Sequence, residues 1–368
     1  MLPCRAVLDG TRLEGTRLES ERIDVAADAL ELYELSLREG WGDGLPVLPP
    51  TEARVEALLA ATSRASSDSV TVLPPRNGTA TVEKIAVNAA MAGVEPAAFP
   101  YVLAAIEAIS RPDHNLLGLT TTTSSATSYL IVNGPRRAEL GFDCEAGCLG
   151  GGGGRGSMTV GRAVLLCLRN IGGQRAGATS KTVFGQPARA AGACFGEWEE
   201  RSPWPSLAAR RGLSAADEVI TAHASKGVHA FADGNTRRVT DLLQLIAKTI
   251  AFPLGNAFHG SPARGQTVLL VNPVWAERFA AELPDVRDVQ SVLFEHAWQP
   301  LSQWPLDNQH LLEERGRVSS GGRVMMHASP DQFVIVVCGG LGNLQAVALP
   351  TWGDSAMQSA LVGRQRSG

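Results

Sequence analysis

The amino-acid sequence predicts an α/β fold with mixed or parallel sheets flanked by helices. Three short apolar runs, residues 129–135, 267–273 and 333–338, each end at a turn and read as buried strands. In the first two runs Asn and then Pro follow the apolar residues, a repeat consistent with two related α/β units. Such units also recur without duplication. In either case the loops at the carboxyl ends of the strands are the expected site.

Composition and length set the broad class of the protein. The chain has 368 residues, 44% of them apolar, which suits two domains at about 150 residues each. We expect a leader or edge segment over residues 1–25, an α/β unit with a Gly-rich loop over 26–215, and a second α/β unit over 216–368. The net charge of −4 argues against nucleic acid as a partner. Because no apolar run of about 18 residues occurs, we expect no membrane span and a cytoplasmic location.

Periodic apolar residues predict most of the helices. The predicted helical segments are residues 26–39, 51–62, two within 82–110, 159–169, 237–251 and 274–283. Thr51 is a suitable N-cap for the second of them. Residues 116–133, which contain a threonine-rich run, predict extended chain instead. The small residues of 82–110 favour a homodimer, although the same composition also suits an internal core.

The most unusual stretch surrounds five consecutive glycines, residues 150–154. Consecutive backbone N–H groups beside a helix start can bind an anion, so the run is either an anion or cofactor cradle or a flexible loop. Asp143, Cys144 and Cys148 precede it. With one or more histidines, these three residues would suit a transition metal through mixed ligation, and the two cysteines could instead form a redox pair or be unreactive. The sequence assigns no other cofactor.

A second group of chemistry-bearing residues provides candidates for acid–base or nucleophilic work. Carboxylates among apolar neighbours have raised pKa values, thiols are nucleophiles and histidines titrate near neutrality. The candidate catalytic residues are Cys194, Glu197, Lys181, His229 and His296. The candidate substrate-binding residues are Asn88, Arg155 and Arg162.

Several motifs together resemble one family of bacterial proteins. They are residues 43–47 (DGLPV), 49–50, 73–76, 82–93 (VEKIAVNAAMAG), 131–135, 185–187, 202–204 and 294–297. In these stretches, which span roughly residues 28–355, the chain is similar to the UGSC family of (seleno)proteins. The resemblance implies chemistry at a chalcogen, either redox exchange or bond cleavage. The chain departs from the family in two ways: it lacks a Cys-Gly-Ser-Cys stretch, and residues 143–154 replace a turn of the Gly-Pro-Gly-Asn-Arg type.

These observations favour an enzyme that acts on a small polar or anionic metabolite in a cleft at strand-end loops. Thiol or acid–base chemistry of the lyase or oxidoreductase type is the leading hypothesis. A metalloenzyme centred on residues 143–148 is one alternative, and a non-catalytic ligand-binding protein or partner subunit is another. The residue types alone do not separate these reaction classes.

Overall fold

Two sheets form the centre of the structure, a computed structural model. It describes residues 5–7, 18–25, 28–258, 261–353 and 355–363. The expected leader or edge segment lies partly outside these residues, and within it β1 (Arg5–Val7) and β2 (Glu21–Ile23) pair in parallel. The first central sheet has the order β15 (Gln358–Leu361), β7 (Val219–Ser225), β5 (Thr127–Asn133) and β6 (Cys194–Gly196). The second has the order β13 (Phe333–Val337), β9 (Thr267–Val271), β14 (Gln345–Leu349) and β8 (His229–Ala232).

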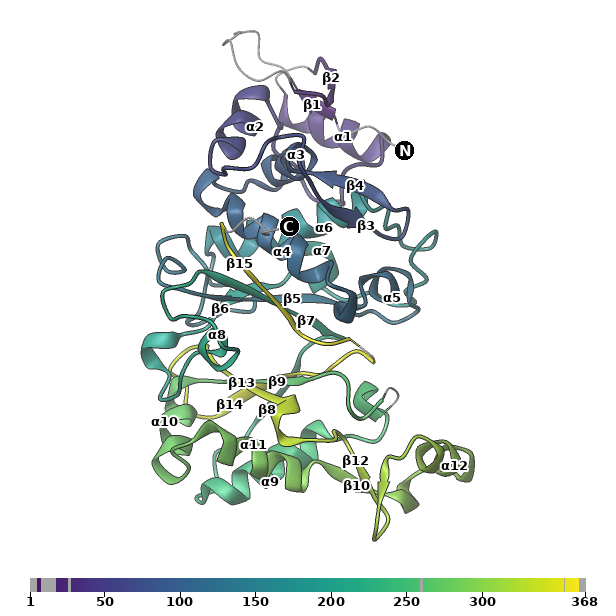
Figure 1. Ribbon diagram of the computed structural model, residues 1–368, viewed down its shortest axis with the longest axis vertical. Helices are drawn as coiled ribbons and strands as arrows, with labels where there is room; N and C mark the ends of the chain where they lie inside the picture. The colour runs from purple at the N-terminus through teal and green to yellow at the C-terminus, as the bar shows by residue number, and fades with distance from the viewer. Residues whose placement is uncertain (1–4, 8–17, 26–27, 259–260, 354, 364–368) are drawn as a thin grey trace.

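The two sheets pack face to face, and helices cover their outer faces, so the molecule has four layers (Figure 1). The helices on the first sheet are α3 (Val82–Ala92), α4 (Phe99–Ile109) and α6 (Arg155–Asn170). Those on the second are α9 (Val239–Ile250), α10 (Pro273–Glu282) and α11 (Val286–His296). The small side chains of α3 and α4 pack in the core between the first sheet and its helices. The predicted α/β class with mixed sheets flanked by helices is therefore confirmed.

Shorter elements surround these layers. The remaining helices are α1 (Ala29–Arg38), α2 (Glu52–Leu59), α5 (Leu116–Thr121), α7 (Ala188–Ala191), α8 (Leu207–Arg210) and α12 (Leu306–Glu314). The remaining strands are β3 (Ser69–Leu73) and β4 (Gly78–Thr81), which form a hairpin, and β10 (Trp298–Pro300), β11 (Val318–Ser319) and β12 (Arg323–Met325), which form a small sheet.

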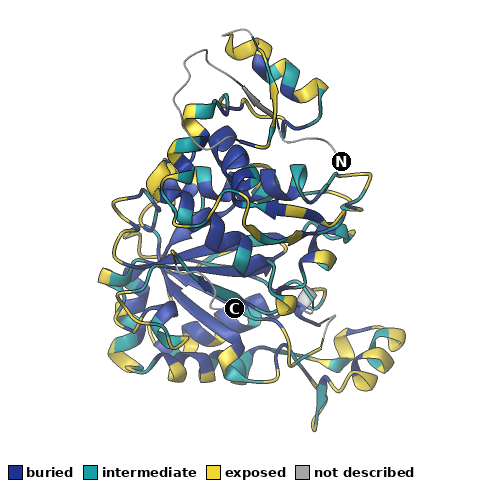
Figure 2. Cartoon of the chain, turned by 45° about the horizontal axis from the view of Figure 1, so that its top comes forward, coloured by how far each residue is buried: buried dark blue, intermediate teal, exposed yellow. Residues whose placement is uncertain are grey.

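The strand sequences explain why the sheets stack. In β5, Leu130 and Val132 face the helices, whereas Tyr129 and Ile131 face the other sheet. Because successive side chains point to opposite faces, a strand buried on both sides must be apolar throughout. Figure 2 shows these central strands as the most continuously buried part of the chain. This double burial is the reason that the predicted strands read as unbroken apolar runs.

The two sheets share one topology and exchange their fourth strands. In each sheet a parallel pair, β5 with β6 or β9 with β13, is joined by a later antiparallel strand, β7 or β14. The chain then crosses to the other sheet, where β8 pairs with β14 and β15 pairs with β7. Strand β8, which follows β7 along the chain, therefore completes the second sheet, and β15, which follows β14, completes the first. The shared strand order matches the repeat seen in the sequence.

The local predictions had mixed outcomes. Thr51 is the N-cap of α2, and its hydroxyl accepts a hydrogen bond from the Arg54 N–H. The prediction of extended chain over residues 116–133 is wrong for its first part, where α5 is helical. Asn115 caps that helix, and the Thr120 hydroxyl donates to the Leu116 carbonyl one turn back. The hydroxyl is thus satisfied within the helix, and α5 forms despite the low helix propensity of threonine.

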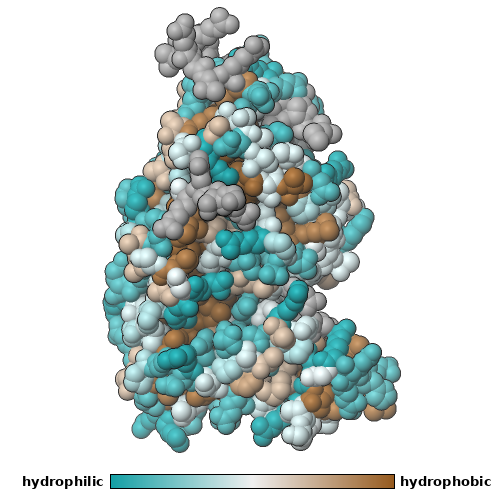
Figure 3. Space-filling model, in the orientation of Figure 1, coloured by the Kyte–Doolittle hydropathy of each residue, from teal (hydrophilic) through white to brown (hydrophobic). Residues whose placement is uncertain are grey.

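Among the described residues, no helix combines the length and the apolar character that a bilayer crossing requires. On the face shown in Figure 3, hydrophobic side chains form small separate groups among hydrophilic ones.

Three buried histidines make the stability of the fold depend on pH. Burial lowers the pKa of His223 to about 4 and the pKa values of His114 and His327 to about 3. The unfolded chain protonates them near pH 6.5, so their contribution is complete above that pH and is lost as the pH falls towards the folded values. We expect the free energy of unfolding to fall on acidification by up to about 1.4 kcal/mol per pH unit for each histidine.

Urea unfolding between about pH 7 and pH 5 measures this slope. His223→Gln should reduce the slope, whereas His310→Gln, at an exposed position, should leave it unchanged. Equal slopes for His223→Gln and the wild type would contradict the assignment.

Candidate functional site

The carboxyl ends of both parallel strand pairs meet at one edge of the sandwich. The Trp198 N–H, just after β6, donates to the Val337 carbonyl at the end of β13, with an N–O distance of 2.7 Å. Cys338 and Glu197 follow β13 and β6 directly, and Asn133 ends β5. The edge that α/β architecture favours for a site is thus built from both halves of the chain.

A buried arginine holds the strand-end loops together. The Arg137 side chain is 3% exposed, and its guanidinium donates to the carbonyl oxygens of Gly134 and Glu197, each at 2.7 Å. It also forms ion pairs with Glu199, at 3.5 Å, and with Glu200. Two carbonyls and two carboxylates therefore surround one cation, which satisfies charges that burial would otherwise make costly.

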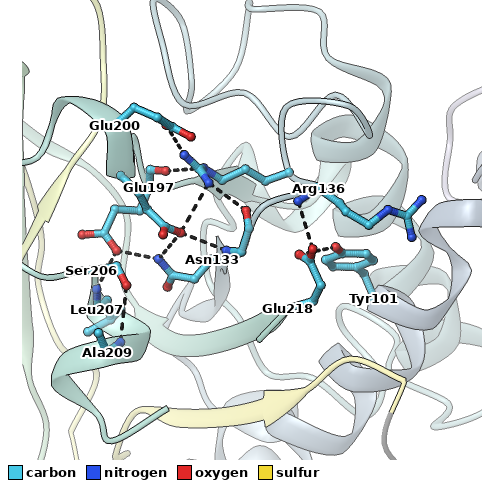
Figure 4. Close-up of polar contacts among 12 residues, drawn as sticks. Tyr101, Asn133, Arg136, Glu197, Glu200, Ser206, Leu207, Ala209 and Glu218 are labelled. Carbon is cyan, nitrogen blue, oxygen red and sulfur yellow. Dashed lines mark hydrogen bonds and ion pairs between the residues drawn. The ribbon is translucent and has the colours of Figure 1, made fainter. Parts of the chain in front are cut away.

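Glu197 lies beside this arginine with its carboxylate buried. Figure 4 shows the carboxylate pointing towards Asn133 and Leu207. One oxygen accepts hydrogen bonds from the Asn133 side-chain amide, at 2.6 Å, and the Leu207 backbone N–H, at 2.7 Å. The other oxygen has no hydrogen-bond partner among the described residues and lies 3.7 Å from the Arg210 guanidinium. Burial raises the pKa of Glu197, and Arg210 opposes this rise.

Two thiols line a pocket at the same edge. Cys148 and Cys338 are among the residues that line a cavity of about 480 Å³ between the Gly-rich loop and the loop after β13. Contact with the Cys338 thiol lowers the pKa of Cys148, because a hydrogen bond stabilises its thiolate. The same contact and burial raise the pKa of Cys338, and the charge of Glu197 raises it further.

Glycines allow the loops of the pocket to approach one another. Gly147 has a φ of +77°, and a Cβ atom there would lie 2.8 Å from the backbone nitrogen of Gly152. Gly339 has a φ of +95°, and its N–H donates to the Cys144 carbonyl at 2.8 Å. Left-handed backbone at these positions requires glycine. The thiols from two distant segments are therefore held in place by backbone contacts.

The end of the five-glycine run binds a carboxylate that belongs to the chain itself. The Gly154 N–H donates to the Asp143 carboxylate at 2.9 Å, just before α6 begins. The Asp143 N–H in turn donates to the Ser157 hydroxyl at 2.8 Å. A carboxylate at a helix N-terminus is favourable, so Asp143 occupies the position expected for a bound anion.

The thiol and carboxylate groups are not arranged as metal ligands. Among the described residues, no group of three or more His, Cys, Asp or Glu side chains is placed to hold a metal ion. Burial raises the pKa of Cys144 to about 11.

The predicted catalytic residues do not converge in the fold. Of the five, only Glu197 lies at the edge that carries the thiol pair. Cys194 is buried in the core between the first sheet and its helices, and burial raises its pKa strongly. Lys181 is exposed on the loop before α7. His229 lies in β8 of the second sheet, where its ring contacts Phe231 of the same strand and Phe252 after α9. His296 ends α11 on the outer face of that sheet.

The predicted substrate-binding residues make internal contacts. Asn88 is fully buried, donates to the Lys84 carbonyl at 2.8 Å and accepts from Asn170 at 2.8 Å. Arg155 pairs with Glu95, and Arg162 forms a two-point ion pair with Asp43 at 2.8 and 2.9 Å. These three side chains are therefore engaged in holding α3 and α6 to their neighbours.

Sequence reasoning did not single out Cys338 as the partner of Cys148. Its position offered a signal, because it follows a buried strand directly and precedes two glycines. A nucleophile at such a strand end, with glycines that admit close approach, is a recurrent arrangement in α/β enzymes.

The Arg137 network should be essential for stability. Arg137→Met removes four contacts of one buried cation, two to carbonyls and two to carboxylates, so we expect a loss of about 3–5 kcal/mol in the free energy of unfolding. Arg136→Met is the matched control, because the neighbouring arginine pairs with Glu139 at the surface and should contribute little. Urea unfolding of both variants provides the comparison, and similar losses in the two would contradict this account.

The pocket, its two thiols and the buried carboxylate beside them are the features from which a function can be inferred. The chain matches no model of a known protein family, and no curated protein sequence matches it.

Proposed function

We propose that the chain is an enzyme of the oxidoreductase type that carries out thiol–disulfide exchange on a small polar or anionic metabolite. The observation that carries this proposal is the mutual contact of Cys148 and Cys338 on the wall of one pocket. A cavity of about 480 Å³ lies within the range of small-molecule sites. Chalcogen chemistry is also what the resemblance to the UGSC family implies.

The electrostatics assign different roles to the two thiols. Cys148 has a lowered pKa and supplies the attacking thiolate, because thiolates and not thiols are nucleophilic. Cys338 has a raised pKa and stays protonated beside Glu197. It therefore stabilises the Cys148 thiolate first and acts as the resolving thiol later.

The reaction balances with a small disulfide as the oxidant. The Cys148 thiolate attacks one sulfur of the substrate disulfide, forms a mixed disulfide and releases the first substrate thiolate, which takes the Cys338 proton. The Cys338 thiolate then attacks the Cys148 sulfur, and the second substrate thiolate leaves and is protonated by water. The products are two substrate thiols and a Cys148–Cys338 disulfide, which a dithiol reductant returns to the starting state.

A lyase reaction would use the same Cys148 thiolate but no second thiol. The placement of Cys338 in contact with Cys148 therefore favours disulfide exchange over the lyase alternative. The exposed polar side chains at the pocket wall, Asn343 and Gln345, suit a polar substrate.

Mass spectrometry of the intact chain tests the exchange directly. We expect the reduced protein to lose two hydrogen atoms on treatment with glutathione disulfide, and a peptide pair to carry a Cys148–Cys338 bond. Cys338→Ser should trap glutathione on Cys148, because no resolving thiol remains, and Cys148→Ser should abolish the reaction.

Cys167→Ser is the control, since Cys167 lies in the helix-side core of the first sheet. It should react as the wild type does. A disulfide between Cys144 and Cys148, or no exchange in the wild type, would contradict the proposal.

The order of alkylation tests the assignment of the nucleophile. Iodoacetamide at about pH 8 should modify Cys148 well before Cys144, because only the pKa of Cys148 is lowered. Peptide mass spectrometry over time gives the two rates. Faster modification of Cys144 would assign the nucleophile to that residue instead.

A further inference from the structure

A second pocket lies beside the carboxyl-terminal half of α6. Its volume is about 580 Å³, and α6 and the segment up to α7 form its walls. Arg169 and Arg189 line it together with Leu165, Thr182 and Phe184. None of these residues lines the pocket that holds the two thiols.

Three arginines at intervals of seven residues form a stripe along α6. Residues seven apart lie on nearly the same face of a helix. Arg155 pairs with Glu95 and Arg162 pairs with Asp43. Arg169 continues the stripe into the pocket, but its Nε atom is buried and has no hydrogen-bond partner among the described residues. The first two arginines of the stripe form ion pairs, whereas the charge of Asp43 acts on Arg169 without a direct contact.

Two further arginines from the neighbouring segment add to this positive charge. One guanidinium nitrogen of Arg189 donates to the Ser180 hydroxyl at 3.0 Å, and the other is buried without a partner. Arg175 also has a buried, unpartnered guanidinium nitrogen. Burial and repulsion by Arg169 lower its pKa to about 10, so it remains a cation at neutral pH.

The carboxylate nearest to these cations is already used. Asp43 is the acidic residue among the described residues that line the pocket, and its two oxygens bind Arg162 at 2.8 and 2.9 Å. A buried guanidinium N–H without an acceptor is costly, so a pocket whose two arginines each keep one such N–H is suited to an anion supplied from outside.

The rest of the wall has a different character. Phe184 is 95% exposed at the pocket, an unusual position for an aromatic ring, and Leu165 and Pro187 add apolar surface. The buried hydroxyl of Thr182 has no hydrogen-bond partner either. A ligand that offers an oxyanion to the arginines and an apolar group to Phe184 would satisfy both parts of the wall.

We propose that this pocket binds an organic oxyanion, a carboxylate or phosphate carried on an apolar or aromatic group, through Arg169 and Arg189. The planar guanidinium fork matches both oxyanions, which is why the two form one ligand class. The Gly-rich loop of the thiol pocket precedes the amino end of α6, whereas this site lies towards its carboxyl end. The proposal is therefore independent of the thiol chemistry.

Isothermal titration of the full chain with three probes tests the ligand class. We expect phenyl phosphate and benzoate to bind, with the stronger of the two identifying the oxyanion, and benzyl alcohol to bind at least about tenfold more weakly because it lacks the charge. Inorganic phosphate should also bind more weakly than phenyl phosphate, because it has no group to cover Phe184. If neither aromatic oxyanion binds the wild type, the proposal is wrong.

Substitutions then locate the site. Arg169→Met and Arg189→Met should each weaken binding of the better probe by about tenfold or more. Arg238→Met removes an equal charge at an exposed position on the opposite outer layer and should leave binding unchanged. Wild-type affinity in both pocket variants would overturn the assignment.

Stability without ligand distinguishes a binding role from a structural one. Because the Nε atom of Arg169 is buried without an acceptor, Arg169→Met should raise the melting temperature of the unliganded protein. Arg162→Met, which breaks an ion pair on the same face of α6, should lower it. If Arg169→Met instead destabilises or fails to fold, Arg169 is structural and the proposal fails.

Discussion

The face-to-face packing of two sheets is the constraint on which the rest of the structure depends. Each sheet is buried on both faces, between its own helices and the other sheet, so its strands leave little room for solvated polar groups. Charged and nucleophilic side chains are therefore displaced to the strand ends. Since both parallel pairs point to the same edge, the loops that follow them meet there, and thiols from the two halves of the chain come into contact.

Burial gives the same residue type different roles at different places. Arg137 is surrounded by carboxylates and carbonyls, and this saturation makes it a structural cation. Arg169 and Arg189 are half-buried, each with one buried nitrogen that lacks an acceptor, and we infer that they bind a ligand. The cysteines divide in the same way: Cys194 lies in apolar core, whereas Cys148 has a neighbouring thiol that stabilises its anion. Residue identity does not decide the role; the surroundings of the charged form do.

Much of the fold could be predicted from the sequence because its signals are local. Apolar runs that end at turns mark β5, β9 and β13, and Thr51 marks the start of α2. Helix α5 was missed because its threonines have low helix propensity and the cap at its start comes from Asn115, outside the threonine-rich run. The candidate site was largely missed for a different reason. The sequence places Lys181, Cys194 and Glu197 close together, but the fold separates their side chains. Cys148 and Cys338 are far apart in the sequence and meet only because the two sheets pack face to face.

The exchange of fourth strands also determines when the first sheet can be completed during synthesis. Its edge strand β15 comes from residues 358–361, far along the chain from the strand β7 that it covers. While the ribosome is still making the second half, β7 has an open edge with unpaired N–H and carbonyl groups. Such an edge is a template for strands of other chains. The nascent protein therefore has an interval of exposure to misassembly that ends only when the last strand pairs, and in this interval a chaperone would protect it most.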